Sequence, residues 1–263
     1  MSSYRFALRP RWVLSHLLIA LLVVVMVSLG FWQLRRLHEK QAANRAVKAN
    51  TALAETPVDS LLSPGGDYAA GSAAAFRRVT ATGTYDVANE VIVRARTLNG
   101  QPGVWVLTPL RLAGGSAVVV NRGFLPSAGT PDSVPADAAP PGGTVSVHGL
   151  VQATQTRGAI GATDPADGHL FDMARADIAR LAQQVGYPML PAYVQLKTSD
   201  PASPGSLPTP LPDPVLDEGP HLSYAIQWFL FSTIAVIGYP LILRRRARQG
   251  DEKAALDEPV LAA

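Results

Sequence analysis

The sequence predicts a membrane protein in which two transmembrane helices flank an extracytoplasmic α+β domain built mainly from antiparallel strands. Two observations predict the helices: residues 12–32 and 221–243 are apolar runs without Asp, Glu, Lys or Arg. A helix of either length can cross a hydrocarbon layer about 30 Å thick. A third observation predicts the domain, because short β-branched segments separated by Gly, Asn and Pro lie between the two runs.

The charges beside residues 221–243 predict the direction of that helix. Residues 205–220 contain acidic residues but no Lys or Arg, whereas four arginines lie within residues 244–248. Basic residues are retained on the cytoplasmic side, so this helix should enter the membrane from outside and end inside the cell. Residues 12–32 have basic residues on both sides, so the second helix decides the orientation. Both termini are then expected in the cytoplasm.

The apolar run at residues 12–32 also has to be distinguished from a targeting segment. It is longer than the apolar region of a secretory signal, about 7–15 residues, and no small-x-small cleavage site follows it. Eleven residues precede it, too few for the Arg- and Ser-rich leader of a mitochondrial presequence. We therefore expect an uncleaved anchor and a multi-pass protein of a bacterial inner (plasma) membrane.

The remaining segments differ in composition and pattern. Five β-branched runs after residue 76 indicate an antiparallel sheet or small barrel, followed by a helix from Asp172 to Gly186 and a last strand. The predicted segments are a cytoplasmic N-terminus at 1–11, a helical extension of the first span at 33–55, a loop at 56–75, the mainly-β domain at 76–200, a Pro-rich tether at 201–220, and a basic, then disordered, cytoplasmic tail at 244–263.

The composition excludes several kinds of site. The chain has no cysteine, which excludes disulfides, covalent c-type haem attachment, thiolate metal sites and iron–sulfur ligation. Its net charge of +3 comes from basic residues near the apolar runs rather than from a stripe with interleaved aromatics, so no nucleic-acid partner is expected. No nucleophile with its base, carboxylate pair, phosphate loop or histidine–carboxylate cluster has the required spacing, so the chain is not expected to be an enzyme.

The outer end of the second apolar run holds the first candidate binding residues. The spacing of His221, Tyr224, Ala225 and Trp228 places them on one helix face, and Gln227 is a further polar residue there. This face is either a ligand or cofactor site, as ionisable residues at membrane helices often indicate, or an interfacial belt whose polar tips are wetted among the headgroups.

Two other residues are candidates outside this face. His38 follows the first run on the same side of the membrane as His221, so the two imidazoles could form a pair. Arg122 ends an apolar strand beside Gly123. It either pairs with a nearby acid, next to a glycine with an unusual backbone angle, or acts as a bidentate clamp for a carboxylate or propionate.

Several stretches together resemble the Surfeit locus protein 1 family of cytochrome c oxidase assembly factors. RRVTATGTYD, PGVWVLTPL and VVVNRGFLP resemble its central blocks, although Phe124 stands where the family usually shows Trp, and HLSYAIQWF resembles its second-span motif. GFWQLRRLHEK resembles its motif G-x-W-Q-x-x-R-x-x-x-K, with matching residues Gly30, Trp32, Gln33, Arg36 and Lys40.

The resemblance implies a role in building haem–copper oxidases, in which bacterial members are thought to hold haem a for insertion into the catalytic subunit. It makes His221 the candidate axial ligand of the haem iron, and the full candidate set is His221, Tyr224, Gln227, Trp228, Arg122 and His38. The expected partners are the oxidase subunits, above all the haem-bearing catalytic subunit, and the lipid membrane. The alternative is a scaffold, or a stably bound accessory subunit of the oxidase or its supercomplex, that does not touch haem.

Overall fold

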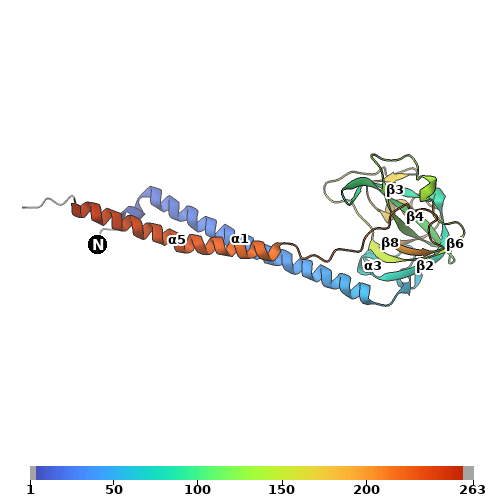
Figure 1. The fold of residues 1–263 in the computed structure, drawn as a ribbon, viewed down its shortest axis with the longest axis horizontal. Coiled ribbons are helices and arrows are strands. Elements are labelled where there is room, and N and C mark those ends of the chain that lie inside the picture. The colour runs from blue at the N-terminus through green and yellow to red at the C-terminus, as the bar shows by residue number, and fades with distance from the viewer. Residues whose placement is uncertain (1–3, 257–263) are drawn as a thin grey trace, which may run out of the picture. The chain divides into compact units, whose positions relative to one another are not determined.

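The computed structural model describes residues 4–256, which form two units (Figure 1). The helical unit contains the chain up to Arg45 and from Leu216 onward, and the β-rich unit contains Ala46–Val215. The helices are η1 (Arg5–Leu8), α1 (Pro10–Ala52), α2 (Val58–Leu61), α3 (Tyr68–Ala73), η2 (Val87–Asn89), η3 (Ala136–Ala138), α4 (Ile178–Ala182) and α5 (His221–Leu256). The strands are β1 (Thr56–Pro57), β2 (Arg78–Tyr85), β3 (Val91–Leu98), β4 (Gln101–Leu112), β5 (Ala117–Pro126), β6 (Thr144–Ala153), β7 (Asp172–Met173) and β8 (Met189–Asp200).

The helical unit is an antiparallel pair of α1 and α5, which lie side by side in Figure 1. Near the start of α1, the Tyr239 hydroxyl donates to Ser15 Oγ at 2.9 Å and lies 2.7 Å from His16 Nδ1. Further along α1, Gly30 faces the Phe229 ring, which would be 2.7 Å from a Cβ at this position. A small residue at such a crossing lets two helices approach closely. Later residues of α1 therefore meet earlier residues of α5.

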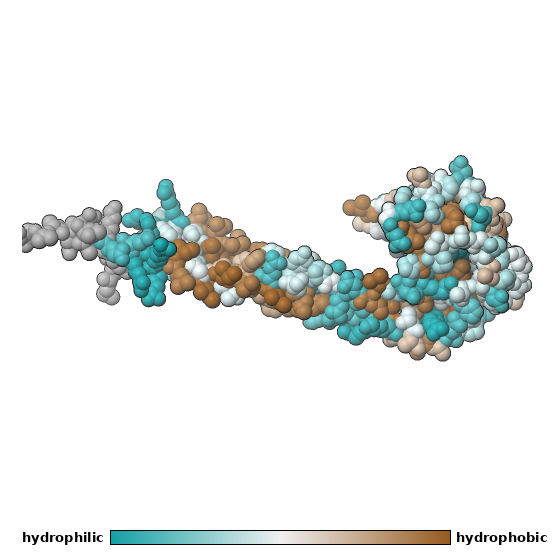
Figure 2. All heavy atoms as spheres, viewed as in Figure 1, coloured by the Kyte–Doolittle hydropathy of each residue, from teal (hydrophilic) through white to brown (hydrophobic). Residues whose placement is uncertain are grey.

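Both long helices expose apolar side chains along their apolar runs. They are long and apolar enough to cross a membrane, and in Figure 2 the visible face of the pair is mostly hydrophobic between hydrophilic ends. Leu17, Phe31 and Ile234 are each about three-fifths exposed, at 64%, 58% and 58%. Contact of this much apolar surface with water is unfavourable, so α1 and α5 are candidate membrane helices.

Both helices also extend beyond the predicted spans. α1 carries the first apolar run and most of its predicted extension in a single helix that ends at Ala52. α5 continues through the first part of the predicted disordered tail to Leu256. The prediction of a disordered tail after Arg248 is wrong as far as Leu256, because Gln, Glu, Lys, Ala and Leu are good helix formers and extend a helix that is already nucleated. Residues 257–263 lie outside the described residues.

A barrel-like sheet forms the β-rich unit. Its strand order is β1-β2-β6-β8-β5-β4-β3-β7, and an additional pairing of β2 with β4 joins β2, β6, β8, β5 and β4 into a ring. The β3–β4 hairpin turns at Asn99 and Gly100, whose φ angles are 51° and 79°. An Asn-Gly pair with positive φ at both residues is typical of a tight hairpin turn.

Five pairs of strands in the described part of the chain are antiparallel, but the ring is not uniformly so. β5 and β8 pair in parallel, and the two-residue strands β1 and β7 pair in parallel with β2 and β3. Parallel neighbours cannot be joined by a hairpin, and the chain forms β6, β7 and α4 between β5 and β8. The local strand pattern of the sequence does not indicate that β8 returns to pair with β5 after this long connection.

The helix predicted over residues 172–186 is much shorter in the structure. Asp172 lies in β7, which pairs with β3, and its carboxylate forms an ion pair with Arg94. α4 begins only at Ile178, after Asp177, whose carboxylate accepts from the N–H of Arg180 at 3.0 Å. The aspartate cap was therefore assigned to the wrong residue, because long-range strand pairing competed with the local helix signal.

The segment predicted as a loop at residues 56–75 contains β1, α2 and α3 and contributes to the core. Val58, Leu62 and Ala74 are buried at 1%, 3% and 7% exposure. Gly71 of α3 lies against β8, where a Cβ would be 2.3 Å from the carbonyl oxygen of Pro191. The Gly- and Ala-rich composition that indicated a loop instead permits this close approach.

Part of the predicted tether also belongs to the β-rich unit. Thr209 and Phe124 exchange both backbone hydrogen bonds at 2.8 Å, and the carbonyl of Leu211 accepts from Gln195 and Lys197. Residues 201–215 therefore lie on the domain rather than apart from it. Pro-rich sequence removes backbone donors, but the remaining amides and carbonyls are enough to attach the segment.

The stability of the β-rich unit should fall at alkaline pH because of three tyrosines. Burial raises the pKa of Tyr85, Tyr187 and Tyr193, in the last case to about 12. The folded state thus favours the neutral phenols, and this contribution is complete below the ordinary phenol pKa of 10.0 and is lost as the pH rises towards 12.

We expect the near-UV circular dichroism of the full chain in detergent to report unfolding that becomes easier above about pH 10. Tyr193→Phe removes one of the three phenols and should show a smaller loss of stability over the same range. A wild type whose stability is constant up to pH 12, where the Tyr193 pKa lies, would contradict this prediction.

Candidate functional site

The helical unit places His221 directly beside α1. His221 is the first residue of α5, and its Nδ1 lies 2.8 Å from Oε1 of Gln33. Gln33 comes immediately after the first apolar run, within the first motif that carries the family resemblance, and His221 opens the last one. The contact therefore joins two motifs that are 188 residues apart in the chain.

The segment preceding His221 is attached to the same helix. The Gln41 side chain donates to Glu218 Oε2 at 3.0 Å, and the Asn44 side chain donates to the carbonyl of Asp217 at 3.3 Å. Gln33, Gln41 and Asn44 recur at spacings that bring them to one face of α1. Together with the contact of Gln33 to His221, these hydrogen bonds hold the start of α5 and the residues just before it against α1.

Gly219 lies at the opposite edge of the imidazole. Its φ is 70°, which favours glycine, and a Cβ at this position would be 3.5 Å from both Nε2 and Cδ2 of His221. Within residues 4–256, Nε2 has no hydrogen-bond partner. One ring nitrogen is therefore engaged with Gln33, while the other is bordered by a residue without a side chain.

The other residues of the predicted helix face are arranged less closely. Ala225 is buried at 1% exposure, whereas Tyr224 is 47% exposed and Gln227 is exposed. The Trp228 ring is partly buried and lies edge-on to Phe231 at 6.4 Å between centroids. An imidazole flanked by exposed aromatic surface is compatible both with a flat apolar ligand and with an interfacial belt.

The structure does not pair His38 with His221. His38 is exposed and lies five residues after Gln33, which places it about 140° further round α1. The residue that α1 offers to His221 is the glutamine and not a second imidazole. The sequence analysis did not include Gln33 among the candidate site residues. Two features could have identified it: it is a polar residue directly after an apolar run, and it belongs to the motif GFWQLRRLHEK.

Arg122 lies in the interior of the β-rich unit and cannot act as a surface clamp. Its side chain is 1% exposed, and its Nη2 donates to Glu90 at 2.6 Å. Its Nε donates to the Thr108 hydroxyl at 2.8 Å and its Nη1 to the carbonyl of Ala138 at 2.6 Å. The prediction that it holds a carboxylate of a ligand is corrected, since all three nitrogens have partners inside the domain. The alternative, an acid partner beside a glycine of unusual φ, is what the structure contains: φ of Gly123 is 137°.

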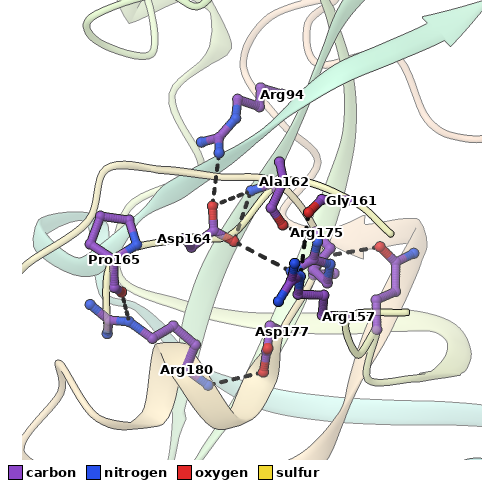
Figure 3. A network of polar contacts seen from close by, with 12 residues as sticks. Arg94, Arg157, Gly161, Ala162, Asp164, Pro165, Arg175, Asp177 and Arg180 are labelled. Carbon is purple, nitrogen blue, oxygen red and sulfur yellow. Dashed lines mark hydrogen bonds and ion pairs between the residues drawn. The ribbon is translucent and has the colours of Figure 1, made fainter. Parts of the chain in front are cut away.

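A second polar network lies nearer the surface of the same unit (Figure 3). Arg94 forms ion pairs with Asp172 and with Asp164, the latter at 2.9 Å, and Asp164 also accepts from the N–H of Ala174 at 2.8 Å. Arg180 donates to the carbonyl of Pro165 at 2.8 Å. The network attaches the long segment between β6 and α4 to strand β3. An open cavity of about 400 Å³ lies beside it and is lined by residues 94–97, 102–103 and 127–130.

The donor set around His221 suits haem better than a bare metal ion. Among the described residues, no group of three or more His, Cys, Asp and Glu is placed to hold a metal ion. A bare ion generally takes three or four protein ligands, whereas the iron of haem already has four porphyrin nitrogens and needs one or two axial ligands from the protein. A single imidazole whose Nε2 has no hydrogen-bond partner among the described residues could meet that smaller requirement.

The fold and the site together define a class: a protein with two candidate membrane helices, a barrel-like β domain and a single oriented imidazole at the start of the second helix. The model of the SURF1 family matches residues 20–233. The chain therefore belongs to the SURF1 family, which confirms the resemblance inferred from its motifs. Members of this family are generally oxidase assembly factors, associated with membranes, and they are not a known class of enzymes.

Its relatives extend over nearly the whole chain. It is 32% identical to an uncharacterised SURF1-like protein of Mycobacterium bovis over 98% of this chain and 93% of that protein. The identity and coverage are the same for a SURF1-like protein of Mycobacterium tuberculosis strain H37Rv. A SURF1-like protein of Monosiga brevicollis is 29% identical over 90% of this chain and 88% of its own length.

Proposed function

We propose that this protein spans a membrane twice, binds haem a through His221, and delivers it to the catalytic subunit of a haem–copper cytochrome c oxidase. The observation that carries this proposal is the imidazole of His221, whose Nδ1 is engaged by Gln33 and whose Nε2 has no partner in the described part of the chain. Family membership supplies the link to oxidase assembly. Haem a, when bound, supplies the redox-active iron that the finished oxidase needs.

The surroundings of His221 support a haem site at the surface of the helical unit. A porphyrin is flat and largely apolar, so it needs exposed apolar side chains around its axial ligand. Trp32, Leu222 and Tyr224 are next to or near the two contacting residues in the chain and are 45%, 53% and 47% exposed. In a lipid environment this surface also lets the cofactor be released to a partner without passing through water.

The helix pair supports the proposed topology. Ser15 and His16 contact Tyr239 at one end of the pair, and Gln33 contacts His221 at the other. The N-terminal end of α1 and the C-terminal end of α5 therefore lie on the same side. The arginines within residues 244–248 favour the cytoplasm as that side, and the proposal accordingly has the residues between the helices at the outer face of a bacterial inner membrane.

Replacement of the proposed ligand tests the proposal. We expect protein purified in detergent from haem-a-producing cells to carry a haem absorbance. This absorbance should be largely lost in His221→Ala, because the substitution removes the imidazole that ligates the iron. His38→Ala is the matched control: it removes an exposed imidazole from the same unit that does not contact His221, and it should retain the wild-type spectrum.

A scaffold or lasting accessory subunit is the competing function, since family membership alone would be satisfied by either. A colourless wild-type protein, or equal haem content in wild type and His221→Ala, would reject haem delivery through this residue. Retention of the protein in the mature oxidase after gentle detergent extraction would then favour a subunit role.

A further inference from the structure

We infer that Gln33 is a positioning residue that determines which ring nitrogen of His221 carries the proton, and so leaves Nε2 free to ligate iron. This inference rests on the proposed haem site and adds a second residue to it, from the other helix. Its physical basis is the hydrogen bond between Gln33 Oε1 and His221 Nδ1.

The protons of the contact can be counted. An amide oxygen has no proton and only accepts, so the hydrogen bond requires that Nδ1 of His221 carry one. A neutral imidazole has a single N–H, so Nε2 is then unprotonated and keeps its electron pair. An imidazole ligates a metal through such a nitrogen, and the hydrogen bond of the opposite nitrogen to an oxygen fixes both tautomer and ring orientation.

The rest of the contact surface explains why this hydrogen bond persists at a partly exposed position. Gln41 and Asn44 bind the residues that precede α5 and lie about two and three turns beyond Gln33 on α1, so the backbone that carries His221 is restrained independently. Gly219 then leaves the Nε2 edge without a side chain. The imidazole is therefore oriented at its Nδ1 edge by Gln33, and its Nε2 edge is bordered by a residue without a side chain.

This arrangement also makes ligation depend on the pairing of the two helices. His221 belongs to α5 and Gln33 to α1, and neither helix alone fixes the tautomer. A change that separates the helices would free the ring to rotate and to exchange its proton between the nitrogens. Pairing of α1 with α5 therefore prepares the ligand for the cofactor, and their separation weakens its hold.

Nitrogen NMR of the haem-free full chain tests the tautomer directly. Protein with ¹⁵N-labelled histidine is prepared in detergent at about pH 8, where a model imidazole is neutral, and the His221 signals are identified by their loss in His221→Ala. We expect a protonated Nδ1 and an unprotonated Nε2 in the wild type and in Gln33→Glu, whose carboxylate also accepts. In Gln33→Met, which lacks an acceptor, the Nε2-protonated form should appear. A wild type protonated at Nε2, or an unchanged tautomer in Gln33→Met, would overturn the inference.

Titration with haem gives the second readout. Gln33→Met should bind haem about 10- to 100-fold more weakly than the wild type, the usual effect of losing a partner of a metal-ligating histidine, and Gln33→Glu should restore most of the affinity. Gln41→Met is the control for the loss of a helix contact: it removes a glutamine contact from the same face of α1 without touching the ring, so its loss of haem affinity should be clearly smaller than that of Gln33→Met.

The outcomes separate this inference from the proposed function. An equal loss in Gln41→Met and Gln33→Met would mean that the contact only holds the helices together, and would overturn the role of Gln33. Haem binding that survives in His221→Ala would reject the proposed function, whereas the NMR result on the haem-free protein would still decide which ring nitrogen of His221 carries the proton.

Discussion

Replacement of Arg122 by Met should lower the free energy of unfolding of the β-rich unit by about 3–5 kcal/mol, which would remove much of the stability of an ordinary domain. The guanidinium is buried with Glu90, and the side chains are 1% and 6% exposed. The Thr108 hydroxyl donates to Glu90 at 2.5 Å and accepts from Arg122. Loss of the arginine leaves a buried carboxylate without its counter-charge and the Ala138 carbonyl without a donor.

Urea unfolding of the full chain in detergent, followed by amide hydrogen exchange of β5, measures this effect. The double variant Glu90→Leu with Arg122→Met removes both charges and should recover much of the loss, since the cost of the single variant comes mainly from the unpaired charge. Lys197→Met is the control for a pair whose acid is in solvent: Asp213 is 83% exposed and Gln195 still donates to the Leu211 carbonyl, so the cost should stay below about 1 kcal/mol. An Arg122→Met cost as small as that of Lys197→Met would contradict the prediction.

Replacement of Gly123 by Ala should destabilise the same unit by about 3 kcal/mol, by combining backbone strain with a steric clash. Its φ of 137° is unfavourable for a residue with a side chain, and a Cβ here would be 2.3 Å from the carbonyl oxygen of Thr209. That oxygen accepts the Phe124 N–H, so the clash acts on the hydrogen bonds that attach residues 201–215 to β5.

Gly100→Ala separates the two causes of this loss. Gly100 also has a positive φ, 79°, but nothing lies within 4 Å of a Cβ at that position, so only the strain of about 1–2 kcal/mol should appear. Amide exchange at Phe124 and Thr209 should accelerate in Gly123→Ala and remain unchanged in Gly100→Ala. Equal destabilisation in both variants would mean that the contact with Thr209 adds nothing.

The sequence alone was sufficient for the family and for the coarse architecture. The two apolar runs, the β-branched segments between them and the motif residues around Gln33 and His221 are local features, and each was readable without a partner. The matched family model over residues 20–233 confirms the resemblance. Long, periodic segments are dominated by burial or lipid contact along their own length, which is why composition predicts them.

Short elements were predicted less well, because distant contacts decide them. Asp172 had a helix-cap signal but pairs with β3, and the cap is Asp177. Residues 56–75 were Gly- and Ala-rich and were predicted as a loop, yet Val58 is fully buried. In each case the free energy gained from strand pairing or core burial exceeds a local preference of at most about 1 kcal/mol per residue.

The same distinction between local and distant effects applies to the residues of the candidate site. The sequence by itself identified His221 as the imidazole of interest, left two alternatives open for Arg122, and allowed His38 to pair with His221, because residue type and spacing carry chemistry but not distance. Tertiary structure alone buried Arg122 against Glu90, turned His38 to another face of α1, and brought Gln33 to within 2.8 Å of His221. Hydrogen bonds form over about 3 Å, so whether residues 188 positions apart meet depends on the pairing of whole helices and not on either local sequence.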